Sequence, residues 1–215
     1  MVLSDVEEDA LAATTAELRA AGGDVHGIVT DVSNPDKVAA LAAATLERYG
    51  AVHILCNNAG VAGGGVPSWA STLDDWAWVL GVNLMGVVHG HRSFLPIMIE
   101  QDEEAHIVNT ASVAGVAGGS SVYGATKSAV IALSETVHME LADVGPSSLP
   151  PEVSMDDLRQ MFAHGTSPRV VADQVLRAIR EERLYVLTHP EWKGHIEHRM
   201  QAILNGENLT PLPPP

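Results

Sequence analysis

Short apolar runs alternate along this chain with longer stretches in which apolar residues recur at helical spacing. Short runs bounded by turn-forming residues are typical of strands. Stretches with capping residues at the start and a glycine at the end are typical of helices. The predicted strands are VLSDV at 2–6, VHGIVTDV at 25–32, VHILCNNAG at 52–60, AHIVNTAS at 105–112 and RLYVLTH at 183–189. The predicted helices cover 7–23, 34–50, about 73–100, 121–142, 167–182 and 190–206.

Capping signals support several of these helices. Asn34 precedes Pro35 at one helix start, and Gly50 follows the last helical residue of the same stretch. Ser167 precedes Pro168 in the same way. Pro96 lies inside the stretch from 73 to 100 and is expected to bend or end that helix, because proline cannot donate a helical hydrogen bond.

The alternation predicts an α/β fold. Strands that alternate with helices of ten or more residues form βαβ units, whose strands are parallel. The strands are unbroken apolar runs, so we expect helices to cover both faces of the sheet. The predicted architecture is a Rossmann-like, doubly wound parallel sheet in a three-layer αβα arrangement. No internal repeat and no long linker divides residues 1–215, which predicts a single domain.

Composition narrows the classes of function. Hydrophobic residues make up 46% and charged residues 18%, enough apolar material for a packed core. A formal net charge of −15 argues against nucleic acid or an anionic membrane as partner. The N-terminus does not resemble a signal peptide, no apolar run is long enough to span a bilayer, and Cys56 is the only cysteine, so we expect a cytoplasmic protein. The ten histidines complete no metal-ligand pattern, and no metal site is predicted.

Polar residues follow the predicted strands where ligands bind in open parallel sheets, beyond the strands' carboxyl ends. Strand ends are often polar because loops begin there, which explains Asp31 alone well. It explains Asn57 to Gly60 less well, because these small residues would let a ligand lie against the backbone. Asp5 has two open interpretations: it accepts hydrogen bonds from an adenosine ribose, or it caps the following helix. The residues concerned are Asp5, Asp31, Asn57 to Gly60 and Asn109 to Ser112.

A tyrosine and a lysine lie four residues apart in SSVYGATKSAV. On a helix this spacing puts Tyr123 and Lys127 on one face. A phenol has a pKa of about 10, and a nearby ammonium group favours its ionised form. Such a pair is usually an ordinary surface contact. The polar strand ends NTASVAG and NNAG upstream of it favour a catalytic pair instead.

Together these motifs resemble the short-chain dehydrogenase/reductase family. NNAG at 57–60, Asn83 in VNLMG, Ser112 in NTASVAG and YGATK at 123–127 follow the family's order at nearly its spacing. TDV at 30–32 resembles the family's adenine-contacting Asp-Val. The resemblance covers about 2–144 and, more loosely, 167–206.

The resemblance implies catalytic roles for four residues. Tyr123 would be the general acid/base on the substrate oxygen, and Lys127 would lower its pKa and hold the nicotinamide ribose. Ser112 would hydrogen-bond the substrate oxygen, and Asn83 would hold a water that links Lys127 to solvent. The implied activity is hydride transfer between a nicotinamide cofactor and an alcohol or carbonyl substrate.

Cofactor contacts and assembly follow from the same resemblance. The implied cofactor-binding residues, besides Tyr123 and Lys127, are Asp5, Asp31, Val32, Asn57, Ala59 and Gly60. Asp5 occupies the position of the acidic residue in members that prefer NAD to NADP, so NAD is the expected cofactor. Family members are usually dimers or tetramers built through the helices that here hold Asn83 and Tyr123, so we expect a homodimer or homotetramer.

Two departures from the family pattern predict a truncated fold. The family's first strand and its TGxxxGxG turn are absent from the printed sequence, and that strand is central, so two half-sheets are expected. No apolar run follows Gly145, so the strand before the family's Pro-Gly turn is also expected to be absent. Three explanations of this pattern stay open. The sequence is a fragment of a complete enzyme, it is a truncated gene product that folds with rearranged strand pairing, or it omits segments of the real chain. The alternative function is a non-catalytic remnant that binds partner subunits.

Overall fold

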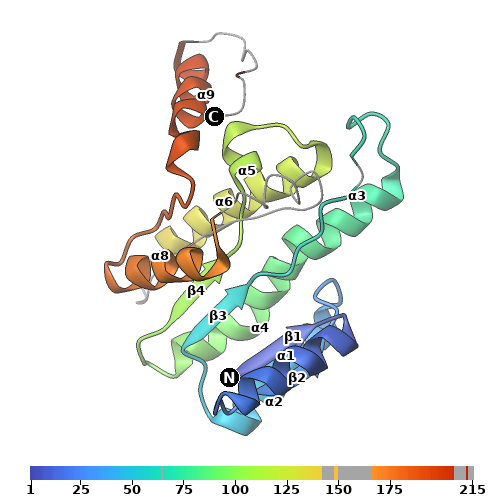
Figure 1. The fold of residues 1–215 in the computed structure, drawn as a ribbon, viewed down its shortest axis with the longest axis vertical. Coiled ribbons are helices and arrows are strands. Elements are labelled where there is room, and N and C mark those ends of the chain that lie inside the picture. Colours follow the sequence, from blue (N-terminus) through green and yellow to red (C-terminus); the bar gives the residue numbers. More distant parts are fainter. Residues whose placement is uncertain (64, 142–147, 150–165, 206–211, 213–215) are drawn as a thin grey trace.

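The strands of this protein form two small parallel sheets (Figure 1). The computed structural model describes residues 1–63, 65–141, 148–149, 166–205 and 212. In one sheet β1 pairs with β2, and Asp5 lies opposite Val29. In the other the order is β3-β4-β5, and Asn57 lies opposite Asn109. The expectation of two half-sheets agrees with this topology. The strands are β1 (Val2–Asp5), β2 (His26–Val29), β3 (Ile54–Asn57), β4 (His106–Asn109) and β5 (Ser148–Leu149).

Helices follow the strands in the predicted order. Asn34 caps α2 by accepting hydrogen bonds from two backbone N–H groups, and Gly50 ends it with a φ of 77°. Within the described ranges, none of the helices has the length and apolarity to cross a bilayer. The helices are α1 (Glu8–Ala20), α2 (Pro35–Tyr49), α3 (Leu73–Leu80), α4 (Gly86–Glu100), α5 (Val113–Ala117), α6 (Ser121–Leu141), α8 (Pro168–Arg180) and α9 (Lys193–Asn205), with a 3₁₀ turn at Pro190–Trp192.

The helix predicted from 73 to 100 is continuous but not uniform. Thr72 and Asp75 form a capping box at the start of α3. A π-helical turn, η1 (Gly81–Met85), joins α3 to α4. The expectation that Pro96 would end the helix is wrong, because α4 contains it and runs on to Glu100. The irregularity lies instead at η1, where a π turn adds a residue and is often found at a functional site.

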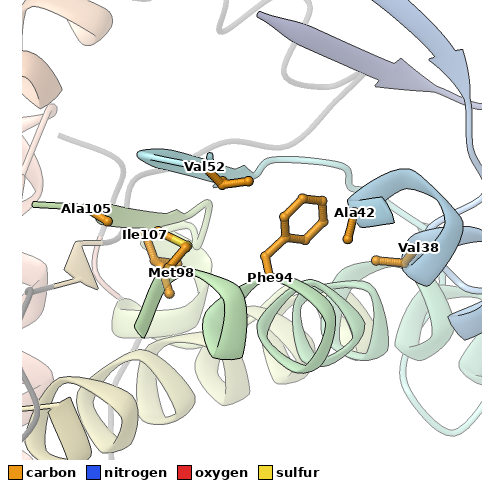
Figure 2. Close-up of a cluster of buried hydrophobic side chains, with 7 residues drawn as sticks. All are labelled: Val38, Ala42, Val52, Phe94, Met98, Ala105 and Ile107. Atoms are coloured by element: carbon orange, nitrogen blue, oxygen red, sulfur yellow. The ribbon is translucent and has the colours of Figure 1, made fainter. Parts of the chain in front are cut away.

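A buried hydrophobic cluster fixes α4 between α2 and the second sheet (Figure 2). Phe94 and Met98 project from α4 and are each no more than 5% exposed. On one side they meet α2, and on the other they meet residues around β3 and β4. Burying a Phe or Met side chain contributes about 2–3 kcal/mol. The cluster therefore holds the amino ends of β3 and β4 at a fixed place along α4. Its members are Val38, Ala42, Val52, Phe94, Met98, Ala105 and Ile107.

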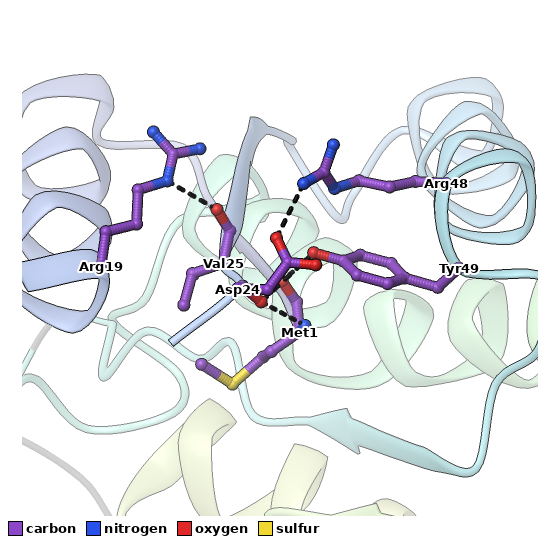
Figure 3. Close-up of polar contacts among 6 residues, drawn as sticks. All are labelled: Met1, Arg19, Asp24, Val25, Arg48 and Tyr49. Carbon is purple, nitrogen blue, oxygen red and sulfur yellow. Dashed lines mark hydrogen bonds and ion pairs between the residues drawn. The ribbon is translucent and has the colours of Figure 1, made fainter. Parts of the chain in front are cut away.

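Polar contacts tie the ends of α1 and α2 to the start of β2 (Figure 3). Arg19 Nε donates to the Val25 carbonyl at 2.7 Å, and Arg48 pairs with Asp24 at 2.7 Å. The Tyr49 hydroxyl donates to the Asp24 carbonyl at 3.3 Å. The Arg48–Asp24 pair is exposed and contributes little to stability by itself. The contacts therefore attach the ends of both helices to the amino end of the first sheet.

Two predictions about the second half of the chain are wrong. Residues 183–189 form no strand; their apolar residues pack on α8 instead, where Val186 meets Ala178. The expected loop at 146–154, with no strand after α6, contains β5, which pairs in parallel with β4. One leucine among prolines and serines carries too little periodicity to reveal a two-residue strand. The remaining residues of that loop, and most of the C-terminal tail, lie outside the described residues.

Both faces of β4 are buried, as expected, whereas one face of β2 and of β3 is partly exposed among the described residues. Successive strand residues point to opposite faces. On β4, Ile107 belongs to the buried cluster, and Val108, which points the other way, is 5% exposed. On β3, Leu55 packs against the cluster, whereas its neighbour Ile54 is 52% exposed, and on β2 Val29 is 48% exposed. The apolar runs did not predict which faces of these two strands are covered.

Replacing Thr15 by valine is expected to stabilise the fold. Thr15 is 6% exposed, and its hydroxyl has no hydrogen-bond partner among the described residues. An unsatisfied buried hydroxyl costs about 1–3 kcal/mol, which an isosteric methyl group does not incur. We expect Thr15→Val to raise the free energy of unfolding by about 1 kcal/mol in urea titrations. The neighbouring exposed Thr14→Val is the control and should change it by less than about 0.5 kcal/mol. A destabilised Thr15→Val would contradict the assignment.

Candidate active site

Lys127 is buried inside the protein at the carboxyl end of the second sheet. It is 1% exposed, and its ammonium group donates to the Thr110 carbonyl at 2.6 Å. Burial lowers the pKa of Lys127 to about 8. Thr110 directly follows β4, so this hydrogen bond joins α6 to the polar end of a central strand. Burying an ammonium group is costly, and such costs are concentrated at functional sites.

Tyr123 lies one helical turn before Lys127, as predicted. It is 4% exposed, and the Lys127 ammonium lies 5.8 Å from the centre of its ring. The pair is therefore not an exposed surface contact, which was the ordinary alternative. Both side chains occupy the buried side of α6 that faces β4 and η1. The structure thus places a buried ammonium group beside the tyrosine ring.

Asn83 occupies the π-helical turn and is fully buried. Its Oδ1 accepts from the Val61 N–H at 2.7 Å, and its Nδ2 donates to the Val61 carbonyl at 2.9 Å. Nδ2 also donates to the Thr126 hydroxyl at 3.1 Å. A side-chain amide carries two N–H donors, and both are used here. Asn83 thus holds the turn after NNAG against α6.

Gly60 lies where Asn83 and Lys127 meet. A Cβ at this position would be 3.4 Å from Lys127 Nζ and 3.5 Å from Asn83 Oδ1. Both distances are ordinary contact, so the backbone here passes directly beside the two polar side chains. The structure brings together Gly60, Asn83, Tyr123 and Lys127, which the sequence predicted as one site.

Ser112 is placed by the short helix α5. It is 5% exposed, and its hydroxyl accepts from the Ala114 N–H at 3.2 Å, which caps α5. Ser128 Oγ on α6 donates to the Gly115 carbonyl at 2.7 Å. That bond fixes α5 against the helix that carries Tyr123 and Lys127. The serine hydroxyl can still donate its own proton while it accepts from the backbone.

Asn57 belongs to a buried polar network at the ends of β3 and β4. Its Nδ2 donates to Asn109 Oδ1 at 2.9 Å, and His91 Nε2 donates to the same oxygen at 3.1 Å. Asn109 Nδ2 in turn donates to Ser134 Oγ at 2.9 Å. The Asn57 amide also leaves no room for a Cβ at Gly90 of α4. The Asn57 side chain is therefore committed to the scaffold. Burial lowers the pKa of His91 and favours its neutral form.

The first sheet places Asp5, Asp31 and Val32 at its carboxyl end. Asp5 Oδ1 accepts from the Glu7 N–H at 2.9 Å, but the N-cap residue of α1 is Glu7, so Asp5 forms a turn before the helix and does not cap it. Asp31 Oδ1 accepts from the side chain and backbone of Ser33, and these bonds lower the pKa of Asp31. The Val32 carbonyl accepts from Nδ1 of His89 at 2.8 Å. Through this bond α4 holds the end of β2 close to the end of β3.

Two residues with structural roles at the site were not singled out from the sequence. Thr110 supplies the carbonyl that binds Lys127, and Thr126 contacts Asn83. Thr126 lies three residues after Tyr123, so helical spacing alone places it beside the predicted pair. Its partner could not have been predicted, because the contact with Asn83 spans 43 residues.

Comparison with known proteins identifies the family. Residues 1–145 match the short chain dehydrogenase family. The chain is 33% identical to 1-deoxy-11-beta-hydroxypentalenate dehydrogenase of Streptomyces avermitilis, covering 89% of this chain and 76% of that protein. It is 30% identical to C alpha-dehydrogenase of Sphingobium sp. strain SYK-6, covering 95% and 77%.

A solved structure agrees with this assignment. The short chain dehydrogenase/reductase from Burkholderia phymatum, in complex with NAD, superimposes with a TM-score of 0.94 at 41% identity. The superposition covers 99% of this chain and 88% of that one. The Rossmann-like α/β fold expected from the sequence is confirmed by this likeness. This protein belongs to the short-chain dehydrogenase/reductase family of oxidoreductases.

Proposed function

We propose that this protein is an NAD-dependent oxidoreductase that interconverts a secondary alcohol and a ketone, with Tyr123 as the general acid/base. The observation that carries the proposal is the buried Lys127 beside Tyr123, at the carboxyl end of the second sheet. A cation is stripped of water there, and in the part of the chain that the structure describes no carboxylate pairs with it. The single cysteine and the acidic surface suit the cytoplasmic location that we also propose.

The residues around Lys127 fit a nicotinamide ribose. Among the described residues, the Thr110 carbonyl is the hydrogen-bond acceptor of Lys127. An ammonium group has three donors, so two remain for the ribose hydroxyls. Gly60 lacks a side chain where one would lie 3.4 Å from the ammonium. A bound nicotinamide would supply the carbon that accepts or gives the hydride.

Tyr123 and Ser112 act on the substrate oxygen. In the oxidative direction, the Tyr123 phenolate takes the proton of the alcohol, and in the reductive direction the phenol returns it. Lys127 stabilises the phenolate, which brings proton transfer toward neutral pH. Ser112 uses its free donor to hold the substrate oxygen as negative charge develops.

Asn83 serves the proton relay through its backbone rather than its amide. Both amide hydrogens are donated to Val61 and Thr126. We therefore infer that the water that links Lys127 to solvent donates a hydrogen bond to a backbone carbonyl near Asn83. A π turn disturbs the regular pairing of helix carbonyls, which makes one available for this purpose.

NAD is proposed over NADP because of Asp5. Its Oδ1 accepts from Glu7, while Oδ2 makes no hydrogen bond within the described ranges. One oxygen thus forms the turn before α1, and the other can accept from ribose hydroxyls. A second negative charge on a 2′-phosphate would be repelled. The family resemblance further assigns five residues to the adenosine side of the cofactor, with Asn57 contributing its backbone. These residues are Asp31, Val32, Asn57, Ala59 and Gly60.

A titration tests this proposal directly. NADH and NADPH are added to the purified chain while cofactor fluorescence is followed, and NAD reduction is measured with 1-phenylethanol and cyclohexanol. We expect saturable NADH binding at least about tenfold tighter than NADPH binding, and turnover with one of the alcohols. A chain that binds neither cofactor below millimolar would contradict the proposal, and tighter NADPH binding would contradict the role of Asp5.

We also propose that the protein is a homo-oligomer built through α3 and α4. Trp78 of α3, Met85 of the π turn and Ile99 of α4 are 53%, 41% and 38% exposed. These three side chains define the face that we propose for the contact, because large exposed apolar side chains are typical of a protein interface.

Charges placed on this face should dissociate the oligomer. We expect the double variant Trp78→Glu, Ile99→Glu to sediment as a monomer where the wild type sediments as a dimer or tetramer, because burying unpaired carboxylates is unfavourable. Leu204→Glu on α9 is the control, since Leu204 is 79% exposed and lies outside this face. A wild-type monomer at micromolar concentration would contradict the proposal.

A further inference from the structure

Thr126 connects three parts of the active site through one hydroxyl. It is fully buried on α6, between Tyr123 and Lys127. Its Oγ1 donates to the Tyr123 carbonyl at 2.7 Å and accepts from Asn83 Nδ2 at 3.1 Å. A hydroxyl has one proton, so the bond to Tyr123 leaves its lone pairs facing Asn83. The donor and the acceptor of each hydrogen bond that links Tyr123, Thr126 and Asn83 are thereby determined.

The Asn83 amide has one orientation that satisfies all its neighbours. Its Oδ1 faces the Val61 N–H and its Nδ2 faces the Val61 carbonyl, so the backbone of Val61 already favours this orientation. The lone pair of Thr126 accepts the second N–H of Nδ2 and favours the same orientation. Without this acceptor, one buried N–H of Asn83 would be unsatisfied, and the amide would lose its attachment to α6. Thr126 therefore anchors Asn83 to the helix that carries Tyr123 and Lys127.

The Gly60–Val61 turn depends in turn on Asn83. The Asn83 amide holds Val61 by two hydrogen bonds, and Gly60 lies directly against Lys127. Movement of this turn would admit water beside the ammonium group. Through Asn83, the hydroxyl of Thr126 thus helps to hold the backbone of this turn, which excludes water from the Lys127 ammonium.

We propose that Thr126 is a positioning residue for the reaction, which holds Asn83, the Gly60–Val61 turn and the first turn of α6 in their working arrangement. This inference rests on the proposed function and assigns Thr126 no contact with the substrate or cofactor. Its effect on the reaction passes through Asn83 and Lys127.

Ser134 provides a matched comparison on the same helix. It is also fully buried, donates to a backbone carbonyl of α6 (Val130, 2.8 Å) and accepts from a side-chain amide (Asn109, 2.9 Å). Ser134 lies about two turns beyond Lys127. The two hydroxyls make the same kinds of bonds, so their removal should cost similar stability. Of these two hydroxyls, only that of Thr126 contacts Asn83.

The experiment compares Thr126→Val, Thr126→Ser and Ser134→Ala with the wild type. Valine keeps the shape of threonine without its hydroxyl, and serine keeps the hydroxyl. We measure kcat and KM for NAD and 1-phenylethanol from pH 6 to 10, NADH affinity and Tm. We expect Thr126→Val to lower kcat about 10- to 100-fold, with NADH affinity within about threefold, because a small displacement of catalytic groups is costly.

The pH profile and the rescue separate positioning from a merely structural role. In Thr126→Val, the limb of kcat against pH that reports the Tyr123–Lys127 pair should move by about one pH unit, because water reaches Lys127. Thr126→Ser should restore both rate and profile. Ser134→Ala should lose as much Tm as Thr126→Val and keep the wild-type profile. Equal rates and profiles in Thr126→Val and wild type would overturn the inference.

Further outcomes distinguish this inference from the proposed function. If Tyr123→Phe is as active as the wild type, or if the wild type lacks turnover, the proposed function fails and the role of Thr126 fails with it. If Tyr123→Phe is inactive while Thr126→Val is unimpaired, only the role of Thr126 is overturned. If Ser134→Ala shifts the profile as Thr126→Val does, the effect belongs to helix stability and the inference is again overturned. NMR of the Asn83 side-chain amide adds a readout without turnover: its protons should exchange slowly in wild type and Thr126→Ser, and rapidly in Thr126→Val.

Discussion

Tyr123→Phe should lower kcat by about 100- to 10,000-fold while leaving NADH affinity within about threefold. The substitution removes one oxygen from a side chain that is 4% exposed, and it keeps the ring that fills the space beside Lys127. Without the phenol, the proton of the substrate alcohol has no acceptor at the site. The ring and the ammonium group remain, so cofactor binding is preserved. Steady-state rates with NAD and 1-phenylethanol, and a fluorescence titration with NADH, measure the two effects.

A second tyrosine supplies the control for this result. Tyr185 is 55% exposed; partial burial of its hydroxyl, and then its hydrogen bond to Glu135, raise its pKa to about 12. Tyr185→Phe removes the same atom from a tyrosine outside the proposed site and should keep wild-type kcat. An active Tyr123→Phe, or an equally inactive Tyr185→Phe, would contradict the assignment of the general acid/base.

Lys127→Met should abolish turnover and stabilise the fold at neutral pH. The lowering of the Lys127 pKa from 10.5 to about 8 corresponds to about 3 kcal/mol of unfavourable free energy in the charged, folded state. Methionine removes that cost and fills most of the same volume. It also leaves the Thr110 carbonyl without its donor, a loss of about 1 kcal/mol or more. We expect a net gain of about 1–2 kcal/mol in urea unfolding at pH 7.

The advantage of Lys127→Met should disappear at high pH. Between about pH 8 and pH 10.5 the unfolded wild type still binds the lysine proton and the folded wild type does not. Wild-type stability therefore rises with pH through this window relative to the variant. Lys193→Met is the control, because Lys193 is exposed and pairs only with Glu197 at 3.4 Å. A gap between wild type and Lys127→Met that is constant from pH 7 to 10.5 would contradict the buried charge.

The sequence was sufficient for helices and strands whose signals are local. The caps at Asn34, Gly50 and Ser167 mark helix ends that the structure confirms. Tyr123 and Lys127 share a buried helix side because their spacing requires it. The assignment of the site began from such short-range patterns, and the order of the motifs completed it.

Long-range pairing was beyond what the sequence could predict. The run at 183–189 has the composition of a strand, but an apolar segment can bury itself against a helix as well as beside a strand, and here it packs on α8. Leu149 belongs to a strand because its backbone pairs with that of β4. The residues next to Leu149 in the sequence do not indicate this pairing. The committed amide of Asn57 likewise depends on Asn109, 52 residues away.

The π-helical turn at Gly81–Met85 has a consequence for how this chain can evolve. A π turn contains one residue more than the α-helix around it, so deleting a single residue there would restore regular pairing and a stronger helix. The same deletion would rotate everything before it by about 100° relative to α4 and swing Asn83 off the site. It would also break the buried hydrogen bonds that Asn83 makes to Val61 and Thr126. The length of this turn is therefore preserved by the contacts of Asn83, whatever a regular helix would gain in stability.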